Sequence, residues 1–98
     1  MSESRSHKTT ANRIAEKLNS EYNSGKGVDI NSPRMAVDVE TEGTVSDGIG
    51  QLQGFKKPVY IAAANQATLK EALEKTEGTT VGVMSPQGEI VKRSSRGK

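Results

Sequence analysis

The spacing of apolar residues predicts a helix near the start of the chain. From Thr10, a favourable N-cap residue, apolar side chains recur at the three- and four-residue intervals of one buried helix face. These side chains are Ala11, Ile14, Ala15, Leu18 and Tyr22. Asn-Ser-Gly at 23–25 ends the pattern, so we expect a helix over about residues 10–22.

Two short β-like runs, 27–30 and 35–40, follow and are joined by a turn at Ser32-Pro33. Side chains alternate between the two faces of a strand, so the second run has one apolar face and one face with two carboxylates. The apolar face consists of Met35, Val37 and Val39, and the other face consists of Ala36, Asp38 and Glu40. We therefore expect a β-hairpin.

The second half of the chain continues the alternation of helix and strand. Val45, Ile49 and Leu52 have helical spacing, although glycines at 48 and 50 disfavour a helix. Residues 58–64 are nearly all apolar, as in an inner strand covered on both faces. A helix over about 67–75 ends before Gly78, and a Ser-Pro-Gln-Gly turn at 85–88 joins a last hairpin, 80–84 with 89–92. The expected order is αββαβαββ, a mixed α/β fold whose helices flank a mixed central sheet.

Length and composition favour one small folded domain. The chain has 98 residues and a net charge of only +2, so its modest 32% hydrophobic content does not imply a self-repelling, disordered chain. We expect a single domain over 9–92, with flexible tails at 1–8 and 93–98. No apolar run is long enough to span a membrane and the first residues lack a signal-peptide pattern, so we expect no membrane partner and a cytoplasmic protein.

Residue counts exclude several kinds of chemistry. The chain has no cysteine and one histidine, His7, which excludes thiolate zinc sites, iron–sulfur clusters, cysteine nucleophiles and multi-histidine metal sites. A Ser-His-Asp triad would need His7, which lies in the predicted N-terminal tail. Any metal ion must therefore bind to oxygen ligands.

Asp38 and Glu40 lie two residues apart on a strand, so their side chains share a face at a spacing of about 7 Å. The predicted hairpin also brings Asp29 near Asp38, so three carboxylates can converge. Such a group suits Mg²⁺ or Mn²⁺, which activate water and neutralise charge on a phosphodiester. A second interpretation is an edge strand with a solvated polar face. Glu16, on the first helix, either extends toward this site or is solvated beside Lys17.

The order of these residues resembles the PD-(D/E)xK nuclease superfamily, which includes restriction endonucleases, archaeal junction resolvases and RecB-type nucleases. The resemblance covers about residues 10–92: a helix with Glu16, a hairpin with Asp29 and Asp38-Val39-Glu40, and a helix with Gln51. It implies a restriction-endonuclease-like sandwich that holds Mg²⁺ at Asp29, Asp38 and Glu40. Gln51-Leu52-Gln53-Gly54-Phe55 also resembles the Q-x-x-x-Y element of the RecB-like branch, with Phe55 where Tyr is usual.

The chain departs from the family pattern in two places. Glu40 occupies the position where the family usually has Lys, so the cation that orients the attacking water is missing, and Gln51 or Lys26 would have to position the reactants. The family's first strand has no clear counterpart before Asp29. These departures keep open an inactive nucleic-acid-binding or protein-interaction module of the same fold, and a scaffold protein with no nucleic-acid role.

Basic residues favour a nucleic-acid partner. Lys92, Arg93, Arg96 and Lys98 lie near the C-terminus, and Lys56-Lys57 forms a second basic group. Such runs bind phosphate without sequence preference, or serve only solubility. Two tyrosines and one phenylalanine are too few for a base-stacking platform, so we expect duplex or branched DNA. Nucleases that cut both strands commonly act as two copies, which is consistent with a homodimer.

Overall fold

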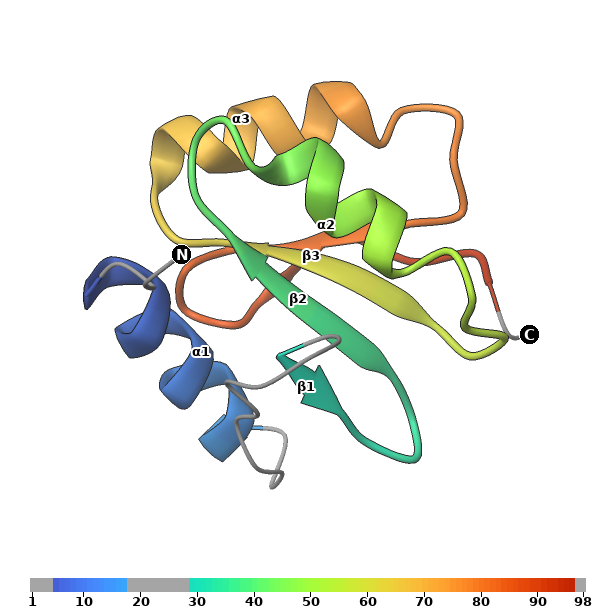
Figure 1. The fold of residues 1–98 in the computed structure, drawn as a ribbon, viewed down its shortest axis with the longest axis horizontal. Coiled ribbons are helices and arrows are strands. Elements are labelled where there is room, and N and C mark those ends of the chain that lie inside the picture. The colour runs from blue at the N-terminus through green and yellow to red at the C-terminus, as the bar shows by residue number, and fades with distance from the viewer. Residues whose placement is uncertain (1–4, 18–28, 97–98) are drawn as a thin grey trace.

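The computed structural model describes residues 5–17 and 29–96, and these form one five-stranded mixed sheet with three helices (Figure 1). The helices are α1 (Arg5–Lys17), α2 (Val45–Gln51) and α3 (Gln66–Lys75). The strands are β1 (Ile30–Asn31), β2 (Ala36–Glu40), β3 (Val59–Ala63), β4 (Gly82–Met84) and β5 (Ile90–Lys92). The expected mixed α/β class is confirmed.

The strands lie in the sheet in the order in which they occur along the chain, β1-β2-β3-β4-β5. β1 and β2 form an antiparallel hairpin, closed by a hydrogen bond from the Ser32 N–H to the Met35 carbonyl at 2.9 Å. β2, β3 and β4 are parallel, because α2 and α3 carry the chain back between them. β5 returns antiparallel to β4 after a turn in which Gly88 has a φ of 84°, a value that favours glycine. Three parallel strands are therefore flanked by one hairpin strand at each edge.

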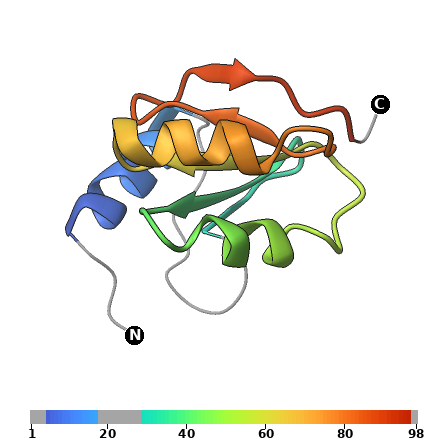
Figure 2. The same ribbon diagram turned by 90° about the horizontal axis from the view of Figure 1, so that it is seen from above.

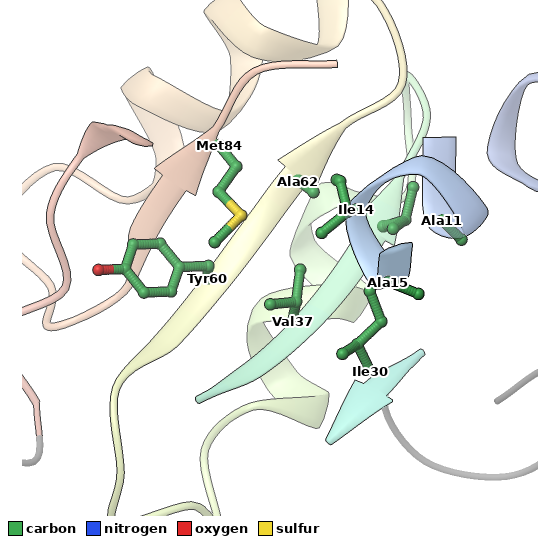
Figure 3. Close-up of a cluster of buried hydrophobic side chains, with 9 residues drawn as sticks. Ala11, Ile14, Ala15, Ile30, Val37, Tyr60, Ala62 and Met84 are labelled. Carbon is green, nitrogen blue, oxygen red and sulfur yellow. The ribbon is translucent and has the colours of Figure 1, made fainter. Parts of the chain in front are cut away.

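The two faces of the sheet carry separate hydrophobic clusters. α1 covers one face, and α2 and α3 cover the other, side by side (Figures 1 and 2). The cluster under α1, shown in Figure 3, consists of Ala11, Ile14, Ala15, Ile30, Val37, Val39, Tyr60, Ala62 and Met84. The cluster under α2 and α3 consists of Ala36, Val45, Leu52, Val59, Ile61, Ala72, Val81 and Val83. The apolar alternation of β2 thus has its predicted consequence, because Val37 and Val39 face α1.

Both ends of the described chain differ from the prediction. α1 begins at Arg5, inside the segment predicted as an N-terminal tail, while Leu18 and Tyr22 lie outside the described residues. Ser94, in the segment predicted as a C-terminal tail, is buried, and its Oγ donates to the Thr80 carbonyl at 2.8 Å and accepts from the Val59 N–H at 3.2 Å. Ser94 therefore holds part of this segment against the starts of β3 and β4. No described helix is long and apolar enough to cross a membrane.

Candidate functional site: a buried carboxylate cluster

β2 is the second strand of the sheet, and all five of its residues are buried. Asp38 is only 3% exposed and Glu40 only 8%. Both share a face with Ala36, which packs in the cluster beneath α2 and α3. The interpretation of these carboxylates as the solvated face of an edge strand is therefore wrong, because β2 is an inner strand and helices cover this face.

Asp29 joins the two carboxylates through the pairing of β1 with β2. Ile30 pairs with Val37, so Asp29 stands opposite Asp38 and points to the same face of the sheet. Asp29 is 7% exposed, and its Oδ2 accepts a hydrogen bond from the Val39 N–H at 2.8 Å. The hairpin thus brings Asp29, Asp38 and Glu40 together as one group, which we call the carboxylate cluster.

The electrostatics of the carboxylate cluster centre on Asp38. Burial raises the pKa of Asp38 from 3.8 to about 10, and hydrogen bonding and repulsion involving Glu40 and then Asp29 act in the same direction. Its Oδ2 is buried and has no hydrogen-bond partner among the described residues. Asp38 is therefore protonated at neutral pH unless a cation compensates the negative charge of the cluster.

A glycine of α2 allows the helix to lie directly on Glu40. A Cβ added at Gly48 would stand 2.6 Å from Glu40 Oε2 and 2.8 Å from Ile61 Cδ1, closer than such atoms pack. The same addition at Gly50 would meet nothing within 4 Å. Gly48, which weakens the helix by its intrinsic propensity, is thus required where α2 approaches the carboxylate cluster.

We expect Gly48→Ala to destabilise the protein by about 1–3 kcal/mol, because overpacking at Glu40 and Ile61 exceeds the gain in helix propensity. Gly50→Ala is the matched control, and it should stabilise by up to about 1 kcal/mol because its methyl group enters open space. Urea unfolding of both variants measures the difference. Equal stabilisation of the two would contradict the close packing of α2 on Glu40.

Polar contacts hold both ends of α2 in place. At its start, Glu71 accepts from the Gly43 N–H at 3.2 Å, and Lys75 Nζ donates to Ser46 Oγ at 3.1 Å. The ion pair with Lys75, followed by the Gly43 N–H, lowers the pKa of Glu71. At its end, Arg96 donates to the Leu52 and Phe55 carbonyls at 2.5 and 3.1 Å. The positive charge of Arg96 also interacts favourably with the negative C-terminal end of the α2 dipole.

The remaining predicted catalytic residues are exposed or lie outside the described residues. Glu16 is exposed on α1, which covers the opposite face of the sheet from Asp38. Gln51 is the exposed last residue of α2. Lys26 lies outside the described residues. The cluster of three carboxylates is therefore what the structure assembles from this set.

The predicted nucleic-acid residues divide into exposed and engaged groups. Lys56 and Arg93 are exposed. Three others bind oxygen atoms within the protein. Lys57 Nζ donates to the Ser32 carbonyl at 2.7 Å and also to Asn31 Oδ1. Lys92 Nζ donates to the Thr76 carbonyl, and Arg96 donates to the carbonyls at the end of α2. Lys98 lies outside the described residues. Sequence reasoning missed Arg34, an exposed basic residue of the hairpin turn.

The donor chemistry of the carboxylate cluster suits a hard cation. Mg²⁺ is usually held by one or two carboxylates with water completing its shell, and Asp38 Oδ2 is an unused acceptor beside two other carboxylates. No three His, Cys, Asp or Glu side chains within 5–17 and 29–96 are already arranged to hold a metal ion. Among the described residues the cluster thus offers at most Asp38 and one neighbouring carboxylate to a single cation.

No protein-family model, curated protein or solved structure matches this chain.

Proposed function

We propose that this protein is a divalent-cation-dependent nuclease domain of the restriction-endonuclease-like type, which hydrolyses phosphodiesters of duplex or branched DNA. The observation that carries the proposal is the gathering of Asp29, Asp38 and Glu40 on one face of two paired strands. Three carboxyl groups buried side by side cost stability unless a proton or a cation compensates their charge, which supports a role in binding a cation.

The order of elements around the cluster supports the same proposal. α1 precedes the hairpin that carries the acids, α2 crosses over directly after Glu40, and β3 returns parallel to β2. This order is consistent with the helix, acidic strand, helix and strand that the PD-(D/E)xK resemblance implies, while the family's first strand has no counterpart among the described residues.

Each carboxylate has a distinct part in the proposed site. Asp38, with Asp29 or Glu40, would hold Mg²⁺ or Mn²⁺, which activates water and neutralises charge on the phosphodiester when bound. The Val39 N–H fixes Asp29, and the backbone of α2 at Gly48 confines Glu40. Glu40 cannot act as the usual Lys, so Gln51 or Lys26 would position the attacking water. A symmetric homodimer would present one such site to each DNA strand.

Thermal unfolding in Mg²⁺ or Mn²⁺ tests the cation site without a substrate. A cation at about ten times its Kd should add about 1.4 kcal/mol to the free energy of unfolding, which raises Tm by about 4–8 °C per kcal/mol for a domain of this size. Asp38→Asn should lose this response. KCl at matched ionic strength controls for charge screening.

NMR titration adds a residue-specific measurement. The signals of Asp29, Asp38 and Glu40 should shift with Mg²⁺ or Mn²⁺ and not with KCl. If neither Tm nor these signals respond to the divalent cations, the cluster is not a metal site and the nuclease proposal fails.

A second candidate function is a DNA-binding or protein-interaction module with the same fold and no catalysis. Two observations favour it: the three carboxylates are at most 8% exposed beneath α2, and Glu40 stands where the family usually has Lys. Tight DNA binding without cleavage under any divalent cation would select this candidate.

A further inference from the structure

Three basic segments, far apart in the sequence, meet at one end of the molecule. They are the β1–β2 turn at 32–34, the connection at 56–57 between α2 and β3, and the segment 93–96 after β5. Figure 1 shows all three on the side where β2 and β3 begin. We call this surface the basic end.

Hydrogen bonds join the first two segments. Lys57 Nζ reaches across to the Ser32 carbonyl at 2.7 Å, and the Ala36 N–H donates to the Pro58 carbonyl at 3.0 Å. Lys57 also lies over the Phe55 ring, 5.5 Å from its centroid. These contacts place the turn that carries Arg34 beside the connection that carries Lys56.

Further hydrogen bonds join the third segment to the second. Arg96 donates to the Phe55 carbonyl, next to Lys56 in the chain, and the Val59 N–H donates to Ser94 Oγ. Arg93 directly precedes Ser94. The three segments therefore lie next to one another at this end of the sheet.

The charge of the basic end differs sharply from that of the whole chain. Its three segments contain Arg34, Lys56, Lys57, Arg93 and Arg96 and no acidic residue, whereas the chain has a net charge of only +2. Lys57 and Arg96 bind backbone carbonyls and support the surface, while Arg34, Lys56 and Arg93 are exposed. A fixed framework thus presents three exposed cations.

The basic end also adjoins the carboxylate cluster. Asn31, which accepts from Lys57, and Asp29 both alternate with Ile30, so they point to the same face of the sheet. Asn31 thus lies about 7 Å along the strand from Asp29. A DNA strand bound at the basic end would therefore pass near Asp29, which is 7% exposed.

We infer that the basic end binds the phosphate backbone of duplex DNA through Arg34, Lys56 and Arg93 and directs one strand toward the carboxylate cluster. This inference rests on the proposed nuclease function for its second half only. A duplex fits better than a membrane, because the large exposed apolar side chains among the described residues, Ile90 and Val91, lie on β5 and not in these segments.

The test measures binding of a fluorescent DNA duplex by anisotropy in EDTA, so that the cation site does not contribute. Three phosphate contacts should give a slope of log K against log salt of about −2.7. Arg34→Gln and Lys56→Gln should each weaken binding roughly fivefold and reduce the steepness of the slope by about 1. Lys70→Gln, an exposed lysine on α3, is the matched control and should bind like the wild type.

Several results would overturn the inference. These are loss of affinity in Lys70→Gln equal to that in Arg34→Gln, absence of duplex binding at low salt, or binding to phosphatidylserine vesicles in place of DNA. If the double variant Arg34→Gln/Lys56→Gln cleaves DNA with an unchanged KM, the basic end does not bind the substrate, but the nuclease proposal is not contradicted. If Arg34→Gln and Lys56→Gln weaken duplex binding, Lys70→Gln does not, and no cleavage occurs, the nuclease proposal is wrong and the DNA-binding role of the basic end is confirmed.

Discussion

Asp38→Asn is expected to stabilise the protein at about pH 8 when divalent cations are removed, because the folded state holds Asp38 as a neutral acid. The pKa of Asp38 rises from 3.8 to about 10 on folding, chiefly through burial. Below pH 3.8 Asp38 is protonated in both the folded and the unfolded state, so the contribution of the neutral Asp38 side chain to the free energy of unfolding is fully present. As the pH rises toward 10, the unfolded state releases the proton and the contribution is progressively lost.

The expected effect is large for one side chain. Each pH unit within this window lowers the free energy of unfolding by up to about 1.4 kcal/mol, so the wild type should be more stable near pH 5 than near pH 8. Asparagine is neutral at every pH and can donate to Glu40 or Asp29. Asp38→Asn should therefore have a flatter dependence of stability on pH, with its advantage over the wild type growing as the pH rises.

Urea unfolding in EDTA at several pH values measures both curves. Glu42→Gln, which neutralises an exposed carboxylate of the β2–α2 turn, is the control and should follow the wild type. If Asp38→Asn is less stable than the wild type near pH 8, the folded protein does not hold Asp38 as a neutral acid and the expectation is wrong.

Local patterns were sufficient to predict most of the strands. The Ser32-Pro33 turn and the glycine at position 88 mark the two hairpins by their backbone preferences, and both hairpins form. The unbroken apolar run of β3 likewise predicts a strand covered on both faces, and all five of its residues are buried.

The burial of the carboxylate cluster could not be predicted, because it depends on where α2 lies. Alternation places Asp38 and Glu40 on one face, but whether that face meets solvent or a helix is a tertiary property. Gly48 lowers helix propensity and so weakens the prediction of α2, yet the space it leaves is what Glu40 occupies. Only the packed structure shows these two effects together.

The C-terminal segment illustrates a second limit. A polar, basic sequence at a chain end is typical of a tail, and nothing local indicates that the Ser94 hydroxyl binds the Val59 N–H. The same applies to Arg96, whose guanidinium binds carbonyls at the end of α2, distant in sequence. Charge composition predicts an affinity for phosphate but does not show which cations the fold itself uses.

Asp38→Asn should also separate catalysis from DNA binding. On the proposed function, loss of this carboxylate removes a cation ligand, so Mg²⁺- or Mn²⁺-dependent cleavage should fall by about 10³-fold or more, equivalent to about 4 kcal/mol of activation free energy. Binding of the duplex in EDTA should be unchanged, because Arg34, Lys56 and Arg93 supply it and the carboxylate cluster does not. The measurement is cleavage of linear and branched DNA with each cation, alongside anisotropy.

The stability expected of this variant is what makes the comparison decisive. A variant that is folded and more stable than the wild type cannot lose cleavage through unfolding, so its lost activity would be assigned to the missing ligand. Glu42→Gln should retain both cleavage and binding. Cleavage that survives at the wild-type rate in Asp38→Asn would show that the Asp38 carboxylate is not needed for catalysis, contrary to the proposed function.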